Sequence, residues 1–148
     1  MIATFRGALP QDAEHVVALM QRYYAEDGYE FDADAALSAL QELLARPALG
    51  QVWCVEASGE TVGYFVLTLG YSLEYRGVDA FLDELYLLPD YRGQGIGKQA
   101  VACLEDRARA LNVRALHLEV ERTKPRAIAL YRRRGFDAHD RFLMTKLL

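Results

Sequence analysis

A glycine-rich segment between an apolar run and a helical pattern constrains this chain most. The apolar run stops at Pro89, glycine stands at every second position of Gly93–Gly97, and helical periodicity extends over Gly95–Leu111. A strand–turn–helix unit of this kind leaves backbone N–H groups free at the helix N-terminus. These donors and the helix dipole favour an anion. The segment therefore predicts a phosphate-binding loop, to which Arg92 and Lys98 add positive charge.

A P-loop for nucleoside triphosphates is one alternative for this segment. Its pattern, Gly-x-x-x-x-Gly-Lys, requires a glycine five residues before Gly97, and Arg92 occupies that position. A glycine-rich connector that binds nothing is another alternative. Glycines without a role weaken a helix start by about 0.5–1 kcal/mol each relative to alanine, so the repeated glycine favours a binding loop.

The dinucleotide-binding fingerprint is a third alternative. Gly95, Gly97 and Ala100 satisfy G-x-G-x-x-A. Glu119 and Glu121 stand where a ribose-binding acid is expected. The fingerprint glycine normally follows its strand at once, whereas six residues intervene here, and only 27 residues remain after Glu121. This pattern is weaker, but it leaves a nucleotide-binding oxidoreductase fragment as a hypothesis.

Periodicity along the rest of the chain predicts a mixed sheet around this unit. Asp12 opens a helix that Asp27-Gly28 ends, and Asp34 caps a second helix that Pro47 closes. The other expected elements are strands over 2–6, 51–57, 61–71, 80–88 and 115–120, helices over 95–111 and 126–134, and a closing hairpin from Phe136 that includes 141–147. We expect one α/β (α+β) domain over residues 1–148, with a single mixed, largely antiparallel sheet flanked by helices.

Composition and charge limit the expected location of the protein and its expected partners. The 148 residues are 52% hydrophobic, which suffices for one core, and no apolar run could cross a bilayer. The chain start lacks a signal-peptide pattern, so we expect a cytoplasmic location and no membrane partner. A net charge of −4 argues against nucleic acid as a partner. Cys54 and Cys103 are expected as small buried residues, and no metal site is expected, because no histidine cluster lies beside either.

Charge is divided unevenly along the chain. Residues 1–91 hold 4 Lys/Arg and 15 Asp/Glu, a net −11, whereas residues 92–148 hold 13 and 6, a net +7. Such an asymmetry suggests two ligands of opposite sign, but two solvated faces that neutralise each other would give the same count. Charge alone leaves both interpretations open.

Two motifs make the chain resemble the GNAT superfamily of N-acetyltransferases, in particular its small polyamine- and histone-type members. Arg92–Gly97 is similar to the family's R/Q-x-x-G-x-G/A acetyl-CoA signature, and the match extends upstream through Asp83–Pro89. Ala127–Phe136 resembles the family's closing A-x-x-L-Y-x-x-x-G-F segment. Residues 70–148 carry most of the resemblance. It implies a GNAT-like acyl-CoA N-acyltransferase fold, acetyl-CoA (coenzyme A) as cofactor, and acetyl transfer to a primary amine.

The resemblance also implies residue roles. The backbone of Leu85–Leu87 would pair with the pantetheine arm like an added strand, and the N–H groups of Gly93–Lys98 would hold the pyrophosphate. Tyr131 would stand near the thioester sulfur. Many members have asparagine where this chain has Lys124, which leaves that contact open, although a lysine suits a phosphate. The expected cofactor contacts are Leu85, Tyr86, Leu87, Arg92, Gly93, Gln94, Gly95, Ile96, Gly97, Lys98, Lys124 and Tyr131.

Acetyl transfer to an amine needs a base, a donor to the thioester carbonyl and a proton for the thiolate. Asp83 and Glu84 are the candidate bases, unless both are merely solvated or paired. Strand alternation puts them on opposite faces, so only one should reach the substrate, and resemblance to polyamine-type enzymes favours Asp83. An N–H near Leu87 is the candidate oxyanion donor. Tyr131, with an ordinary pKa near 10, is the candidate proton donor, although its type alone fits a packed tyrosine equally.

The acidic half of the chain bears on the acceptor. Acids cluster between the first two expected helices: Glu26, Asp27, Glu30, Asp32 and Asp34. With Glu74 and Asp79 they favour a cationic acceptor, either a small-molecule amine or a peptide lysine, unless the loop is only solvated. A non-catalytic acyl-CoA sensor on the same fold is the alternative function. Related folds often dimerise, so a homodimer is also an open expectation.

Overall fold

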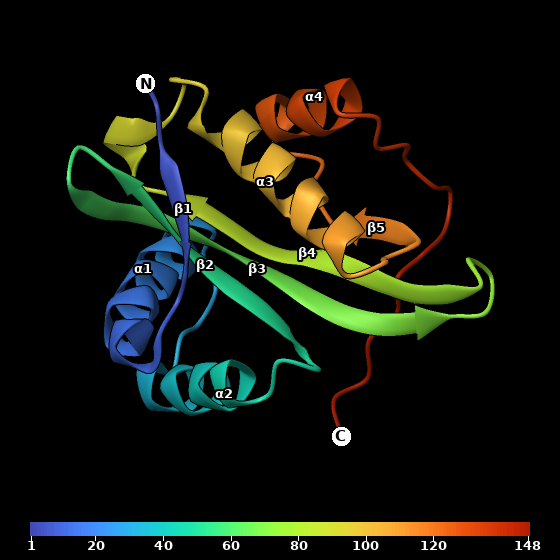
Figure 1. Ribbon diagram of the computed structural model, residues 1–148, viewed down its shortest axis with the longest axis horizontal. Helices are drawn as coiled ribbons and strands as arrows, with labels where there is room; N and C mark the ends of the chain where they lie inside the picture. Colours follow the sequence, from blue (N-terminus) through green and yellow to red (C-terminus); the bar gives the residue numbers. More distant parts are fainter.

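Five strands form one sheet in the computed structural model, which describes residues 1–148 (Figure 1). They are β1 (Thr4–Gly7), β2 (Gly50–Ala57), β3 (Glu60–Ser72), β4 (Gly77–Leu87) and β5 (Ala115–Leu118), in the spatial order β1-β2-β3-β4-β5. Neighbours from β1 to β4 are antiparallel, whereas β5 is parallel to β4. The predicted mixed, largely antiparallel sheet is confirmed.

Four helices cover the two faces of this sheet. α1 (Ala13–Glu26) and α2 (Ala33–Ala45) lie on one face, and α3 (Ile96–Ala110) and α4 (Pro125–Arg133) lie on the other (Figure 1). Short 3-10 turns, η1 (Pro10–Asp12) and η2 (Pro89–Tyr91), precede α1 and α3. None of the helices combines the length and apolar character that a membrane span requires.

Each face of the sheet has its own apolar core, because side chains alternate along a strand. Phe65 and Leu67 of β3 pack with Leu104 of α3 in one core. Tyr64 and Val66, their sequence neighbours, pack under α1 and α2 in the other. Both layers of helices are therefore fixed to the sheet by buried apolar contacts.

The cap of α2 differs from the prediction. Asp32, rather than Asp34, is the N-cap, and its carboxylate accepts a hydrogen bond of 3.0 Å from the N–H of Ala35. Asp32 has the extended backbone that an N-cap requires, whereas Asp34 already lies in the first helical turn. There its charge still favours the helix dipole.

The predicted closing hairpin after Phe136 is wrong. Residues 137–148 form no strand and no backbone hydrogen bond with the rest of the chain, and all of them are exposed. The chain leaves α4 and passes the turn between β3 and β4, where Arg141 pairs with Glu74. An apolar stretch of sequence forms a strand only where a neighbouring edge is within reach. The outer edge of β5 therefore has no neighbour in the sheet.

Candidate functional site

A β-bulge in β4 turns two carboxylates to one face of the sheet. Val66 of β3 pairs with Glu84 and Leu67 pairs with Leu82, so Asp83 has no partner residue. This extra residue resets the alternation, and Asp83 and Glu84 line the same pocket. The prediction that they face opposite sides is wrong, because alternation holds only in an unbroken ladder.

The pocket has a volume of about 370 Å³ and lies between α1, α2 and the middle of the sheet. Its wall is mostly apolar, and its acids come from β4 and from the α1–α2 connection. Glu30 and Asp32 of the predicted acidic group line it, whereas Glu74 and Asp79 do not. Those two pair with Arg141 and with His117 beyond the pocket. The residues that line the pocket are Val16, Met20, Tyr24, Glu30, Phe31, Asp32, Ala35, Ala36, Ala39, Leu40, Leu43, Val66, Asp83 and Glu84.

Two tyrosines hold the carboxylate of Glu84. The hydroxyls of Tyr24 and Tyr64 each donate a hydrogen bond of 2.6 Å to it. Burial raises the pKa of Glu84, and the charge of Asp83 adds to this, although the two hydrogen bonds oppose it. The sequence analysis missed both tyrosines. Tyr64 offered a signal, since a tyrosine at an inward strand position needs a partner for its hydroxyl.

Asp83 is the free member of the carboxylate pair. Its side chain is exposed towards the pocket, and no hydrogen bond or ion pair engages it. The surrounding protein still removes part of the water from its carboxyl group, which raises its pKa. A carboxylate that lacks a partner and has a raised pKa is suited to accept a proton.

The edge of β4 beside these carboxylates is open. β5 pairs only with Asp79–Leu82, so residues 83–87 have no strand neighbour on that side. The N–H of Leu88 donates to β3, and the groups of alternate residues must point the same way. The backbone of Tyr86 therefore belongs to the β3 ladder. Leu85 and Leu87 are left facing the open edge. The backbone of Tyr86, which was predicted to pair with a pantetheine arm together with these two residues, faces β3 instead.

The glycine loop presents an unbroken run of free amides. Gly93 and Gly95 have φ of +73° and +84°, a left-handed conformation that glycine adopts without strain. None of the N–H groups from Gly93 to Lys98 donates to an acceptor within the chain, and the first intrahelical bond comes from Gln99 to Gly95 at 3.2 Å. The loop therefore has the geometry of an anion-binding helix start.

The cations around this loop differ in what they contact. Arg92 turns back to β4 and α1, where its Nε donates to the carbonyl of Leu87 at 2.8 Å and its Nη2 pairs with Glu26 at 2.8 Å. Lys124 pairs with Asp27 at 2.8 Å. Lys98 is exposed and forms no ion pair within 4.0 Å, so it is the free cation of the loop.

Tyr131 lies on α4 and packs against the core on the α3 face of the sheet. A Cβ on Gly97 would contact the side chain of Leu130 at 3.6 Å, so α4 packs on the first turn of α3. The ring of Tyr131 meets Phe136 edge-on, with centroids 5.8 Å apart. Its hydroxyl makes no hydrogen bond within the chain. Burial, with a smaller contribution from Tyr23, raises the pKa of Tyr131 to about 12.

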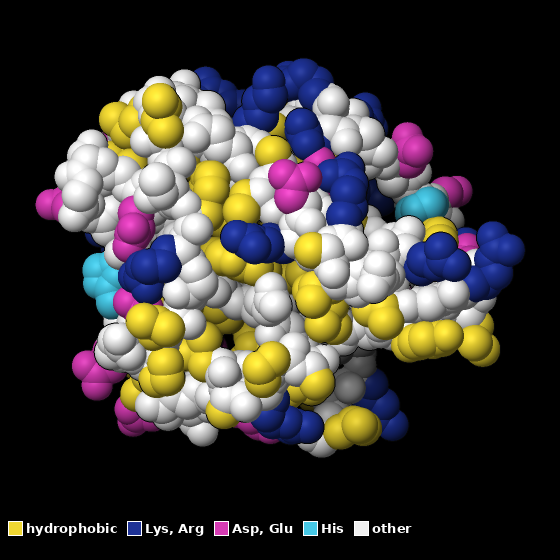
Figure 2. All heavy atoms as spheres, in the orientation of Figure 1, with side chains coloured by type: hydrophobic (Ala, Val, Ile, Leu, Met, Phe, Trp, Pro, Cys, Tyr) yellow, Lys and Arg dark blue, Asp and Glu magenta, His cyan; other side chains and the backbone are white.

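Surface charge follows the division seen along the chain. Figure 2 shows Lys and Arg side chains gathered over α3 and α4, and acidic side chains along the side of α1 and α2. The glycine loop opens on the basic side and the carboxylate pocket on the acidic side. The two candidate binding regions thus lie beside surfaces whose charged side chains are of opposite sign.

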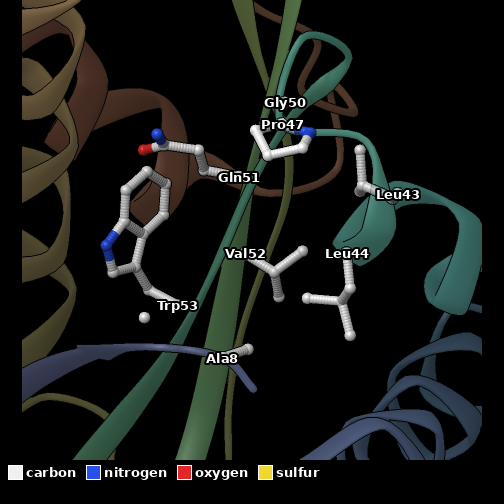
Figure 3. Close-up of a pocket in the computed structure, with 9 residues that line it drawn as sticks. Ala8, Leu43, Leu44, Pro47, Gly50, Gln51, Val52 and Trp53 are labelled. Atoms are coloured by element: carbon white, nitrogen blue, oxygen red, sulfur yellow. The ribbon is translucent and has the colours of Figure 1, made fainter. Parts of the chain in front are cut away.

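A second pocket lacks side chains that could act as an acid or a base. It has a volume of about 280 Å³ and lies where the end of α2 meets β1 and β2 (Figure 3). Figure 3 shows Leu44 and Val52 directed into it from α2 and β2. No titratable side chain lines it, so it is not a candidate active site. Its lining consists of Gly7, Ala8, Leu43, Leu44, Pro47, Gly50, Gln51, Val52 and Trp53.

The chain is similar to known acetyltransferases over nearly its whole length. Residues 16–136 match the Acetyltransferase (GNAT) family. The aminoalkylphosphonate N-acetyltransferase of Salmonella typhimurium is 33% identical over 148 residues, which cover 99% of this chain and 92% of that protein. An integron cassette protein from the mobile metagenome of Cole Harbour Salt Marsh is 37% identical, with a TM-score of 0.88 over 97% of this chain and 90% of that one. A predicted acetyltransferase of Clostridium acetobutylicum, crystallised with acetyl-CoA, shares the fold at 18% identity, with a TM-score of 0.83 over 98% and 96% of the two chains.

Proposed function

This chain belongs to the Acetyltransferase (GNAT) family, and from that premise we propose that residues 1–148 act as one domain that acetylates a cationic small molecule. Acetyl-CoA supplies the acetyl group, and a primary amine attacks it directly in a ternary complex. One observation carries the proposal. The open edge of β4 joins the free amides of the glycine loop to the paired carboxylates of the pocket.

The open edge and the loop fit the two halves of coenzyme A. Leu85 and Leu87 offer backbone groups to an extended amide-bearing arm, as a neighbouring strand would. The carbonyl of Leu87 is already bonded to Arg92, so its N–H is the group that remains free there. The amides of Gly93–Lys98 and the ammonium of Lys98 offer donors and charge to the pyrophosphate.

Asp83 is the proposed base. An ammonium ion has no lone pair, so the acceptor must lose a proton before it attacks. The carboxylate of Asp83 is accessible from the pocket and has no other partner, whereas Tyr24 and Tyr64 occupy that of Glu84. Glu84 then supplies a fixed negative charge beside the amine.

Backbone and phenol donors complete the proposed reaction. The N–H of Leu85 faces the open edge next to the carboxylates, so it is better placed than that of Leu87 to donate to the developing oxyanion. Tyr131 donates its proton to the departing sulfur. Its pKa of about 12 keeps it protonated throughout the range in which amines react.

The pocket supports a small, positively charged acceptor. Glu30, Asp32, Asp83 and Glu84 line it, with the ring of Phe31 among them. Carboxylates attract ammonium groups, and an aromatic face adds a cation–π contact. A cavity of about 370 Å³ fits a small molecule better than a lysine that is carried on a protein surface. The cavity therefore favours a free amine over a peptide lysine as the acceptor. The name of the Salmonella relative specifies an aminoalkylphosphonate, which supports a small-molecule amine as acceptor but, because a phosphonate is anionic, not its positive charge.

A thiol-release screen with acetyl-CoA tests the proposal. Purified protein is incubated with polyamines, aminoglycosides, amino acids and basic peptides, and free coenzyme A is measured. We expect turnover with small polycationic amines above that with basic peptides. Tight acetyl-CoA binding in calorimetry without turnover of any amine would instead indicate an acyl-CoA sensor. Thermal stabilisation by NAD and not by acetyl-CoA would instead support the hypothesis of a nucleotide-binding oxidoreductase fragment.

A further inference from the structure

The end of α1 is joined to the connections that follow β4 and β5. Glu26 pairs with Arg92, between β4 and α3, at 2.8 Å. The next residue, Asp27, pairs with Lys124, between β5 and α4, also at 2.8 Å. α1 and α4 lie on opposite faces of the sheet (Figure 1), so the second pair links the acidic layer of helices to the basic layer.

This link passes beside the open edge of β4. The ring of Tyr23 on α1 stacks on the ring of Tyr86 in β4, with centroids 5.5 Å apart. The ammonium group of Lys124 lies 5.3 Å from the centroid of the Tyr23 ring. Residues 83–87 of β4 have no strand neighbour on the side of β5, so the two layers can meet there.

A hydrogen bond reinforces the link. The N–H of Lys124 donates to the carbonyl of Glu121 at 3.0 Å and closes a turn after β5. The carboxylate of Glu121 accepts a hydrogen bond from the hydroxyl of Tyr29. One turn therefore binds the chain just after α1 at two points, Asp27 and Tyr29. We refer to the Asp27–Lys124 and Tyr29–Glu121 contacts together as the clamp.

The ion pair of the clamp is more buried than a surface ion pair. The side chains of Asp27 and Lys124 are 13% and 37% exposed, whereas those of the Glu42–Arg46 pair at the end of α2 are 61% and 59% exposed. A carboxylate with so little exposure requires its partner. The family resemblance implies a cofactor contact for Lys124, but the hydrogen-bond partner of its ammonium group lies at the end of α1.

The clamp directly precedes the acidic wall of the pocket. Glu30, Phe31 and Asp32 follow Tyr29 and line the pocket. No backbone hydrogen bond involves Glu30 or Phe31. The backbone of this stretch is therefore fixed at its ends. Asp32 caps α2 at one end, and at the other end the clamp holds Tyr29, whose N–H donates to the carbonyl of Tyr24 at 2.9 Å.

We propose that Lys124 is a positioning residue for the amine acceptor. Through Asp27, and together with the bond between Tyr29 and Glu121, it holds the α1–α2 connection so that the acids of the pocket face the bound amine. The inference rests on the proposed function, because it takes the pocket as the amine site. Carboxylates that are already held in place need not be ordered when the amine binds. Breaking the clamp should therefore weaken the binding of the amine and leave the binding of acetyl-CoA unchanged.

Kinetics of two near-isosteric variants test this role. Lys124→Met removes the charge and keeps the length of the side chain. We expect the KM for a diamine to rise about fivefold, with little change in kcat and in the Kd for acetyl-CoA by calorimetry. Asp27→Asn should give the same result. The double variant should also show a rise of about fivefold, rather than the product of roughly 25-fold, because both substitutions break one contact.

Three results would overturn the proposal. A KM for the diamine that stays unchanged in Lys124→Met would exclude the role. A raised Kd for acetyl-CoA in that variant would make Lys124 a phosphate ligand instead. Effects of the two substitutions that multiply would mean that Asp27 binds the amine by itself.

Two further variants serve as controls for the kinetics. Lys124→Arg should keep a low KM, because a guanidinium group also pairs with a carboxylate. Arg46→Met is the matched control, because it breaks the Glu42–Arg46 pair of 2.7 Å outside the pocket, and it should leave the KM unchanged.

Hydrogen exchange tests the clamp without turnover. The N–H of Tyr29 should exchange about fivefold faster in Lys124→Met than in the original chain, and Arg46→Met should leave its rate unchanged. Exchange at Tyr29 that does not depend on Lys124, in a chain that acetylates amines, overturns this inference alone. A lack of amine turnover in the original chain, with exchange still dependent on Lys124, overturns the proposed function and with it the acceptor role of Lys124, but not the clamp.

Discussion

At the scale of single residues, the site depends on groups that lack a partner. Asp83 is free while its neighbour Glu84 receives two phenolic hydrogen bonds, and the hydroxyl of Tyr131 bonds to nothing in the chain. A polar group left free in a partly buried place raises the energy of the folded state. Such groups are typical of sites where a bound substrate supplies the missing partner. Asp83 and Tyr131 are therefore the residues to test at this scale.

Replacing Tyr131 with phenylalanine should remove the proton donor and leave the fold intact. We expect kcat to fall about 100-fold, the lower range for general acid catalysis, while the Kd for acetyl-CoA in calorimetry stays unchanged. Tyr71→Phe is the control, because Tyr71 is an exposed tyrosine of β3 outside the site. A Tyr131→Phe enzyme with the kcat of the original chain would exclude this role.

Replacing Asp83 with asparagine should lower kcat/KM about 100-fold and remove the acidic limb of the pH–rate profile. In the original chain that limb should lie above the ordinary carboxyl pKa of about 3.9, because burial raises the pKa of Asp83. Asp79→Asn is the control, since Asp79 lies in the same strand but pairs with His117 outside the pocket. Its activity should stay close to that of the original chain.

The same Asp83→Asn variant should be slightly more stable at neutral pH. The folded protein binds the Asp83 proton more tightly than the unfolded chain, so the free energy of unfolding falls as pH rises through this window. The loss of stability is complete above the pKa that Asp83 has in the folded protein, and it is absent below the pKa that Asp83 has in the unfolded chain. Thermal melts should therefore show a higher Tm for Asp83→Asn at pH 7 and no difference near pH 3. A lower Tm at pH 7 would show that the carboxylate stabilises the fold.

At the scale of elements, features set by the local sequence were predictable, and features set by contacts between distant segments were not. Alternate glycines followed by helical periodicity predicted the start of α3 at Ile96 to within one residue. The bulge at Asp83 was not predictable, because it depends on how β4 lies against β3 rather than on β4 itself. The unpaired segment after Phe136 shows the same limit. Its apolar residues are typical of a strand, but a strand also requires an edge to pair with.

Gly95→Ala tests the amide loop as an element. At φ +84° an alanine is strained by about 1 kcal/mol, and no atom lies closer than 4.0 Å to the added Cβ, so the effect acts through the backbone. A shifted backbone misdirects the free amides, and we expect the Kd for acetyl-CoA to rise about tenfold, equivalent to about 1.4 kcal/mol.

Gly59→Ala is the matched control for this loop. Gly59 has φ +80° in the β2–β3 turn and equally open space around its Cβ position. Both variants should lose similar stability in chemical denaturation, but only Gly95→Ala should weaken binding. Equal Kd values for the two variants would exclude the loop as the pyrophosphate site.

At the scale of the whole molecule, two charged halves meet at the open edge of β4. The acidic half contributes α1, α2 and the whole lining of the pocket, and the basic half contributes the glycine loop, α3 and α4. The sequence predicted this division, but only the fold shows that the pocket lies beside the open edge of β4 and that the glycine loop follows the end of the same strand. An anionic cofactor and a cationic acceptor would each approach through a field of opposite sign, which raises their local concentrations.

Salt should therefore weaken the binding of a multiply charged acceptor more than the binding of a singly charged one. Raising NaCl from about 0.05 to about 0.5 M shortens the Debye length from roughly 14 to roughly 4 Å, so only the nearest charges still attract. With acetyl-CoA held saturating, we expect the KM of a diamine to rise several-fold. The KM of the monoamine with the same carbon chain should change little, because it carries no second charge for Glu30 and Asp32 to attract. Equal shifts for both amines would mean that salt acts on the cofactor site or on the fold, and that the acids of the pocket do not select a cationic acceptor.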